Sequence, residues 1–161
     1  MKQPYTGFTL IELMIVLVIG GVLLGMAVPS FNTVIRNNRL TTEANNLVTA
    51  FNIARSEAIG RRTNITVCPS SDQATCTGGG WHQGWVVRDT AADEVIQVFA
   101  PMKGNPTVTS TAASVTYTAA GFITGGAAVS IGICMEGGDE GRQINITATG
   151  RPNNATPYPA C

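Results

Sequence analysis

The hydrophobic pattern divides the chain into two different parts. No charged residue occurs from Leu13 to Ile35, and residues 13–28 are almost wholly apolar. With the preceding residues 8–11, this run is long enough for a helix to cross a bilayer of about 30 Å. Beyond Pro29, apolar residues recur at spacings of four, three, four, three and four, which predicts the stripe of an amphipathic helix. The stripe consists of Leu40, Ala44, Leu47, Phe51, Ala54 and Ala58.

These two patterns join into one predicted helix from about Phe8 to Ile59. Gly60 is placed to end it, because glycine readily takes the left-handed conformation that follows many helices. Pro29 lacks a backbone N–H and is expected to bend or loosen the helix. Gly21 and Gly25 form a GxxxG pair, which permits close helix packing.

After Arg62 the helical period disappears, and short β-type runs alternate with turn clusters. The predicted strands are 64–68, 84–89, 94–99, 114–118, 128–134 and 142–148. This spacing favours one antiparallel sheet or two small sheets, with the helix stripe against their apolar face. The proline-rich tail 149–161 is expected to be irregular. The predicted fold class is α+β, with a long N-terminal helix packed on antiparallel β-structure.

Composition and cysteine spacing narrow the possible functions. The chain has 10 lysines and arginines against 10 acids, so no net charge attracts it to nucleic acid. Four cysteines without a CxxC pair, and a single histidine, predict neither a metal site nor another cofactor. The even count favours disulfides in an oxidising compartment over free cytosolic thiols. Of three pairings, Cys68–Cys76 and Cys134–Cys161 are favoured because each closes a short, turn-rich loop.

An acidic residue near the start of the apolar run separates three interpretations of that run. Glu12 costs about 2.5–3.5 kcal/mol on membrane-insertion scales, so an intramembrane acid indicates a function. An ordinary secretory signal or a plain anchor has no use for it. The third interpretation is a pilin-type signal, in which another group compensates the charge.

The segment Gly7-Phe8-Thr9-Leu10-Ile11-Glu12 resembles the signal of type IV pilins and type II secretion pseudopilins. The resemblance implies that a prepilin peptidase cuts between Gly7 and Phe8, and that Phe8 is then N-methylated. It implies that Glu12 pairs with the N-terminal ammonium of a neighbouring subunit, because a charge buried among helices is tolerable only when paired. Pro29 falls where many pilins carry a helix-bending proline.

The head carries a second resemblance, to the minor pilins of the GspH/FimT group, which includes FimU-like members. It rests on Arg55-Ser56-Glu57-Ala58, Arg61-Arg62-Thr63, VCPS, GW-x-x-GW and a late GR. The implied domains are a leader 1–7, a membrane and filament-core helix half 8–35, and a periplasmic or extracellular head 36–161. The head would comprise a helix half 36–60, a β-rich part 63–148 and the tail 149–161.

The resemblance implies a structural, non-enzymatic subunit that helps to prime a type IV pilus or lies at its tip. Its partners would be other minor pilins, the major pilin, the prepilin peptidase and the inner-membrane assembly platform. As a precursor it would be a single-pass protein of the bacterial inner membrane, and later part of the pilus, the periplasm or the cell surface. The first alternative is the H-type pseudopilin of a type II secretion system.

The second alternative is a FimT-like minor pilin that binds DNA during natural transformation. FimT-like members carry a motif resembling Gly-Arg-x-Arg, whereas this chain has Gly150-Arg151-Pro152-Asn153. Arg142 is the other nearby cation, and Glu136, Asp139 and Glu140 precede it. Because DNA affinity depends on neutralising several phosphates, binding through Arg142 and Arg151 is not the favoured interpretation.

Overall fold

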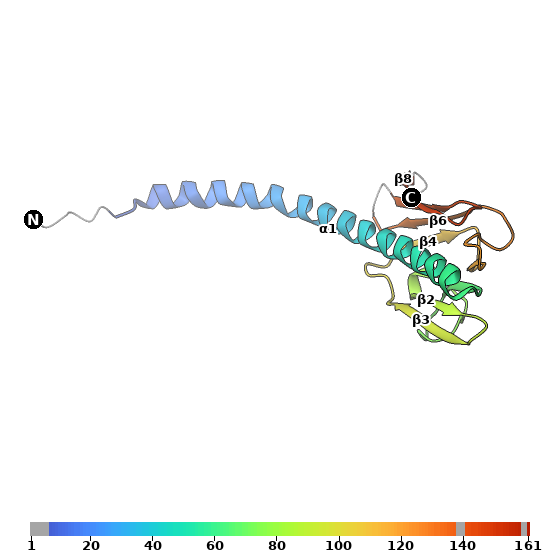
Figure 1. The fold of residues 1–161 in the computed structure, drawn as a ribbon. Helices are drawn as coiled ribbons and strands as arrows, with labels where there is room; N and C mark the ends of the chain where they lie inside the picture. The colour runs from blue at the N-terminus through green and yellow to red at the C-terminus, as the bar shows by residue number, and fades with distance from the viewer. Residues whose placement is uncertain (1–6, 138–140, 159–160) are drawn as a thin grey trace, which may run out of the picture. The chain divides into compact units, whose positions relative to one another are not determined.

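The computed structural model describes residues 7–137, 141–158 and 161; the side chains of residues 26–30 and 155–157 are not described. The chain divides into two compact units, Met1–Ile35 and Arg36–Cys161. The helix α1, Leu10–Arg61, begins in the first unit and ends in the second (Figure 1). It passes through Pro29 without interruption. Asp139 and Glu140 lie outside the described residues.

The observed ends of α1 differ by two residues from those predicted. At the C-terminal end, Gly60 lies inside the last turn, and Arg62 takes the left-handed conformation with φ of 56°. The last turn is held by Arg61, whose guanidinium lies 2.6 Å from a carboxylate oxygen of Glu57 and 2.6 Å from one of Glu94. The helix therefore continues until a non-glycine residue ends it.

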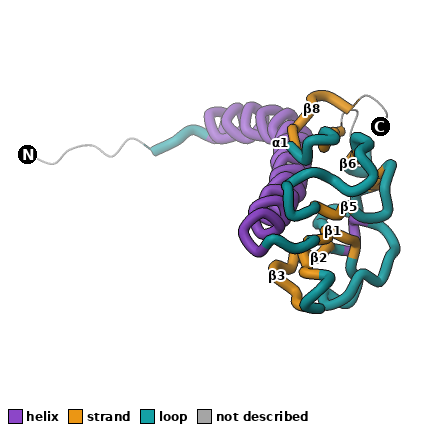
Figure 2. The backbone as a smooth tube through the Cα atoms, turned by 45° about the vertical axis from the view of Figure 1, so that its right-hand side comes forward, coloured by secondary structure: helices purple, strands orange, loops and turns teal. Residues whose placement is uncertain are grey.

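The second unit contains two antiparallel sheets of four strands each (Figures 1 and 2). The first has the order β3-β2-β1-β5, with β1 Ile65–Pro69, β2 Trp85–Asp89, β3 Glu94–Phe99 and β5 Val115–Tyr117. The second has the order β4-β6-β7-β8, with β4 Thr107–Ser110, β6 Val129–Cys134, β7 Gly141–Ile146 and β8 Pro152–Tyr158. A short 3-10 helix, η1 Trp81–Gln83, precedes β2. Of the two arrangements left open by the sequence, one antiparallel sheet or two small sheets, the structure has two sheets.

The core of this unit lies between the second half of α1 and the two sheets. All six residues of the predicted stripe are buried, and Ala50 joins them. Phe51 packs against Trp81, with ring centroids 6.0 Å apart, and Trp85 stacks on Phe99 at 5.3 Å. The inward residues of both sheets complete one cluster with the helix. The amphipathic prediction for this half of α1 is confirmed.

The prediction of an irregular tail is wrong, because β8 forms within it. β8 pairs with the free edge of β7, in the register Ile146↔Pro152 and Ile144↔Asn154. Its proline at position 152 is the first residue of an edge strand, where the missing N–H costs no ladder hydrogen bond. β4 was also not predicted, because its sequence TVTS offers a single apolar side chain, Val108. Both strands form because β6 and β7 offer edges to pair with.

Candidate functional site

The bond between Gly7 and Phe8, predicted to be cut, precedes α1. Gly7 has no regular secondary structure, and apart from its chain neighbours no atom of the described residues lies within 4 Å of a Cβ placed on it. The Phe8 side chain is 82 % exposed. A peptidase would therefore meet an accessible, non-helical segment here.

The first turn of α1 is capped by Thr9, the residue immediately before the helix. The Glu12 N–H donates to Thr9 Oγ1 at 3.3 Å, and the Leu13 N–H donates to the Thr9 carbonyl at 3.2 Å. Thr9 is thus the N-cap, and Glu12 stands three residues later, as in a capping box. A carboxylate in the first turn also interacts favourably with the helix dipole. The pattern Thr-x-x-Glu before an apolar run is the sequence signal of such a cap, which the prediction of a helix start at Phe8 missed.

Glu12 is exposed, and among the described residues no cation pairs with it. Its carboxylate is therefore free for a partner outside the chain. Pro29, the other predicted assembly residue, lies within α1 among residues whose side chains are not described.

The first unit presents an unusually large apolar surface. Every large apolar side chain described from Phe8 to Ile35 is exposed, from Ile35 at 46 % to Phe8 at 82 %. Soluble monomers rarely expose contiguous apolar patches beyond a few hundred Å², so this surface indicates a partner or an apolar medium. The space around Gly20, Gly21 and Gly25 is open. Residues 8–35 were predicted to cross a bilayer, but no helix in the described part of the chain is long and apolar enough to span a membrane.

Two disulfides fasten the loops of the second unit. Cys68 at the end of β1 is joined to Cys76, and Cys134 at the end of β6 is joined to Cys161. This is the pairing that the loop lengths favoured. The second bond joins β6 to the end of the tail, as that pairing predicted.

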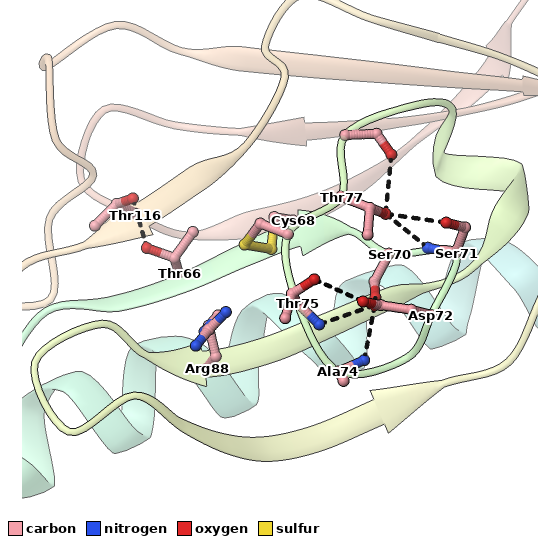
Figure 3. The surroundings of a disulfide bond; sticks show 12 residues. Thr66, Cys68, Ser70, Ser71, Asp72, Ala74, Thr75, Thr77, Arg88 and Thr116 are labelled. Atoms are coloured by element: carbon pink, nitrogen blue, oxygen red, sulfur yellow. Dashed lines mark hydrogen bonds between the residues drawn. A yellow bond between two sulfur atoms is a disulfide. The ribbon is translucent and has the colours of Figure 1, made fainter.

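The loop closed by Cys68–Cys76 is organised around one carboxylate (Figure 3). Asp72 Oδ1 accepts from the N–H groups of Ala74 and Thr75 at 3.0 and 2.9 Å, and Oδ2 accepts from Thr75 Oγ1 at 2.6 Å. Ser70 Oγ donates to the same carboxylate at 2.8 Å. The bonds from Thr75, with those from Ala74 and Ser70, hold the pKa of Asp72 well below its ordinary value of 3.8. All of these bonds lie within the loop, so Asp72 serves as a structural acceptor.

The lowered pKa predicts how Asp72→Asn changes stability with pH. Because the folded state favours the ionised carboxylate, its contribution is present above pH 3.8 and is lost as pH falls further. Asparagine cannot accept from Thr75 Oγ1 through its nitrogen, so the variant should melt at a lower temperature than wild type at neutral pH. The two melting curves should converge in strong acid. A melting-temperature difference that persists unchanged at acid pH would contradict this role.

The two arginines proposed for DNA binding lie at different ends of β7. Arg142 is the second residue of β7, is half-buried and lies opposite Ile133. Arg151 is exposed beyond the other end, where its carbonyl accepts from the N–H of Thr147. From position 142 to position 147 a strand extends about 17 Å, roughly twice the screening length in physiological salt. The structure therefore does not bring Arg142 and Arg151 into one patch.

Comparison with known proteins decides the family. A model of the family described as Type II transport protein GspH matches residues 43–150. The chain belongs to the GspH family. A second model, the prokaryotic N-terminal methylation motif, matches residues 3–28, which include Gly7, Phe8 and Glu12. No curated protein matches the chain.

Solved structures confirm the type IV pilin-like α+β fold of this GspH-family chain. One is the type IV minor pilin FimU of Pseudomonas aeruginosa, with 22 % identity, a TM-score of 0.63 and coverage of 74 % of this chain and 90 % of FimU. FimU in another crystal form gives a TM-score of 0.57 at the same 22 % identity, covering 73 % of this chain and 93 % of that chain. The minor pseudopilin EpsH of the Vibrio cholerae type 2 secretion system has 14 % identity and a TM-score of 0.53, covering 73 % of this chain and 97 % of EpsH. These likenesses concern the fold.

Proposed function

We propose that the chain is a structural minor pilin that helps to prime a type IV pilus or lies at its tip. The observation that carries the proposal is the first half of α1. Its large apolar side chains are exposed, and its first turn carries Glu12 without a cation among the described residues. Such a helix is incomplete alone and becomes stable when surrounded by other apolar helices. The methylation motif over residues 3–28 supports the same conclusion.

The proposed sequence of events begins with a membrane-anchored precursor. A prepilin peptidase cuts between Gly7 and Phe8, and Phe8 becomes N-methylated. The apolar half of α1 then packs against other minor pilins and the major pilin on the inner-membrane assembly platform. Glu12 sets the register by pairing with the Phe8 ammonium of a neighbouring subunit, because an unpaired carboxylate among packed helices is strongly unfavourable. Pro29 lets the helix adapt to its neighbours.

The disulfides support a pilus over a secretion pseudopilus. Cys134–Cys161 fastens the tail to β6, and Cys68–Cys76 closes the loop after β1. Clamped loops suit a protein exposed outside the cell, where free tails fray and are cut by proteases. The H-type pseudopilin remains the alternative, since the same helix would serve a periplasmic filament.

Deletion of the chromosomal copy distinguishes these two filaments. We expect the deletion strain to lose most of its surface pili, counted by electron microscopy, while secretion of folded exoproteins continues. The wild-type chain should restore the pili. A Gly7→Glu variant, which a glycine-specific prepilin peptidase does not cut, should fail to restore them although it is made. Normal piliation together with lost secretion would assign the chain to a pseudopilus instead.

The arrangement of cations does not favour a DNA receptor. Arg151 lines a shallow hollow with Thr147, Thr149 and Asn153, and no second basic side chain lines it in the described structure. Arg142 lies at the other end of β7, next to Gly141. Appreciable DNA affinity at physiological salt requires several neutralised phosphates, which a single arginine cannot supply.

A further inference from the structure

The second sheet carries a small cleft that the pilin function does not use. The cleft has a volume of about 250 Å³ and collects residues from all four strands of the sheet or their ends. Its chief lining residues are Thr109, Thr111, Ser130, Gly132, Gln143 and Tyr158. On β6, Ile131 and Ile133 enter the core, so Ser130 and Gly132 belong to the opposite face of the sheet. The cleft therefore lies on the face that turns away from α1.

One wall of this cleft depends on a glycine. A Cβ atom on Gly132 would lie 2.7 Å from Tyr158 Cζ and 2.9 Å from Thr109 Oγ1. Glycine at this position thus lets the Tyr158 ring lie across β6, where its hydroxyl is 3.2 Å from Thr109 Oγ1. The disulfide between Cys134 and Cys161 ties the chain back to β6 three residues after Tyr158. The Tyr158 ring is therefore held over β6 by its contact with Thr109 and by the disulfide three residues later.

The lining offers hydrogen bonds but no charge. None of the described residues that line the cleft is acidic or basic. The Gln143 amide makes no side-chain hydrogen bond within the described structure, so its two donors and its acceptor are available. Ser130 Oγ donates to Asn145 Oδ1 at 2.8 Å and retains its capacity to accept. Phosphates and acidic peptides, which are held by cations, do not match this lining.

A neutral sugar matches this set of groups. Each sugar hydroxyl both donates and accepts, which suits an amide beside hydroxyls, and the C–H face of a pyranose suits the ring of a tyrosine. The volume falls below the range of about 300–1,000 Å³ that is typical of pockets for drug-sized ligands, so the cleft has room for one small ring. A peptide side chain would leave more of these polar groups unpaired.

We infer that this cleft binds one pyranose ring of a neutral saccharide. The ring stacks on Tyr158, and its hydroxyls bond with Gln143 and Ser130. The site requires no assembled filament, so the result of its test does not depend on whether the proposed pilus function is correct.

The test is a titration of the whole chain, isotope-labelled and kept in a detergent without sugar head groups. The probes are the methyl glycosides of glucose, galactose, mannose and N-acetylglucosamine, with glycerol as a polyol control. At least one glycoside should shift amide resonances of β4, β6, β7 and β8, with a dissociation constant on the order of 1 mM. Glycerol should not shift them.

Three variants separate binding from folding. Gln143→Ala should weaken binding about 5- to 10-fold, the effect of losing one or two hydrogen bonds. Tyr158→Phe retains the aromatic ring and should lose less affinity for the glycoside than Tyr158→Leu. Gln97→Ala removes the same amide from β3 of the other sheet and should bind as wild type. The inference would be overturned if Gln143→Ala bound the glycoside as tightly as wild type. It would also be overturned if no glycoside shifted these resonances at a concentration of about ten times the expected dissociation constant.

Discussion

Replacing Glu12 by alanine is expected to leave cleavage after Gly7 intact and to reduce incorporation into filaments sharply. The bond that is cut lies outside α1, in a segment whose structure does not depend on the Glu12 side chain. In the proposed filament, however, the carboxylate neutralises the ammonium of a neighbouring Phe8. Removing one partner of a buried ion pair leaves the other uncompensated, at a cost of about 3–5 kcal/mol. Such a cost lowers the occupancy of a subunit site at least a hundredfold.

The measurement compares two immunoblots for each variant. Mobility of the cell-associated protein reports cleavage, and the amount in sheared pili, relative to the major pilin, reports incorporation. Glu12→Gln keeps the shape of the side chain without the charge and should behave like Glu12→Ala.

A matched control tests the capping role of the same turn. Thr9→Ala removes the acceptor of the Glu12 N–H, which costs about 1 kcal/mol of helix stability, but leaves the carboxylate in place. It should therefore incorporate far better than Glu12→Ala. Equal defects in the two variants would show that Glu12 acts through the helix cap, and normal incorporation of Glu12→Ala would exclude the ion pair.

The parts of the fold that were predicted correctly are those encoded by local periodicity. The stripe from Leu40 to Ala58 requires only the 3.6-residue repeat of a helix, and burial follows because one face must pack. Six strands were found near their predicted positions because β-branched runs stand between turn clusters. Glu43 shows the limit of this reasoning: although charged, it is buried, and its carboxylate accepts from the N–H of Lys103 at 3.4 Å.

The features that were missed depend on pairing between distant segments. Apart from its prolines, β8 contains two apolar residues, Ala155 and Tyr158, which are too few to predict a strand from the sequence. It forms on the edge that β7 provides. The cleft around Tyr158 depends on Thr109, Gln143 and the glycine at position 132, which approach one another only in the folded sheet. The N-terminal signal could be recognised from sequence because Gly7, Phe8 and Glu12 lie within six residues. Its assembly partners, by contrast, are not part of this chain.

Removing the Cys134–Cys161 disulfide should destabilise the second unit more than removing Cys68–Cys76. The bridged cysteines are separated by 27 residues in the first case and by 8 in the second. Loop-closure entropy then predicts losses of about 3.5 and about 2.5 kcal/mol for paired Cys→Ala variants. Denaturant unfolding of the whole chain under oxidising conditions measures both values against wild type.

The two variants should also differ in where the structure loosens. Without Cys134–Cys161, β8 is an edge strand with an irregular register between Gly141 and Gln143, held mainly by its hydrogen bonds to β7. Amide exchange should therefore accelerate in β8 and on the facing edge of β7, while β1 and β2 remain protected. Without Cys68–Cys76, acceleration should be confined to the loop around Asp72, whose carboxylate still holds Ala74 and Thr75. Uniform acceleration across both sheets in either variant would show that the disulfides stabilise the unit as a whole. Selective loosening of β8 would instead identify Cys134–Cys161 as the bond that keeps the tail, and with it Tyr158, on the second sheet.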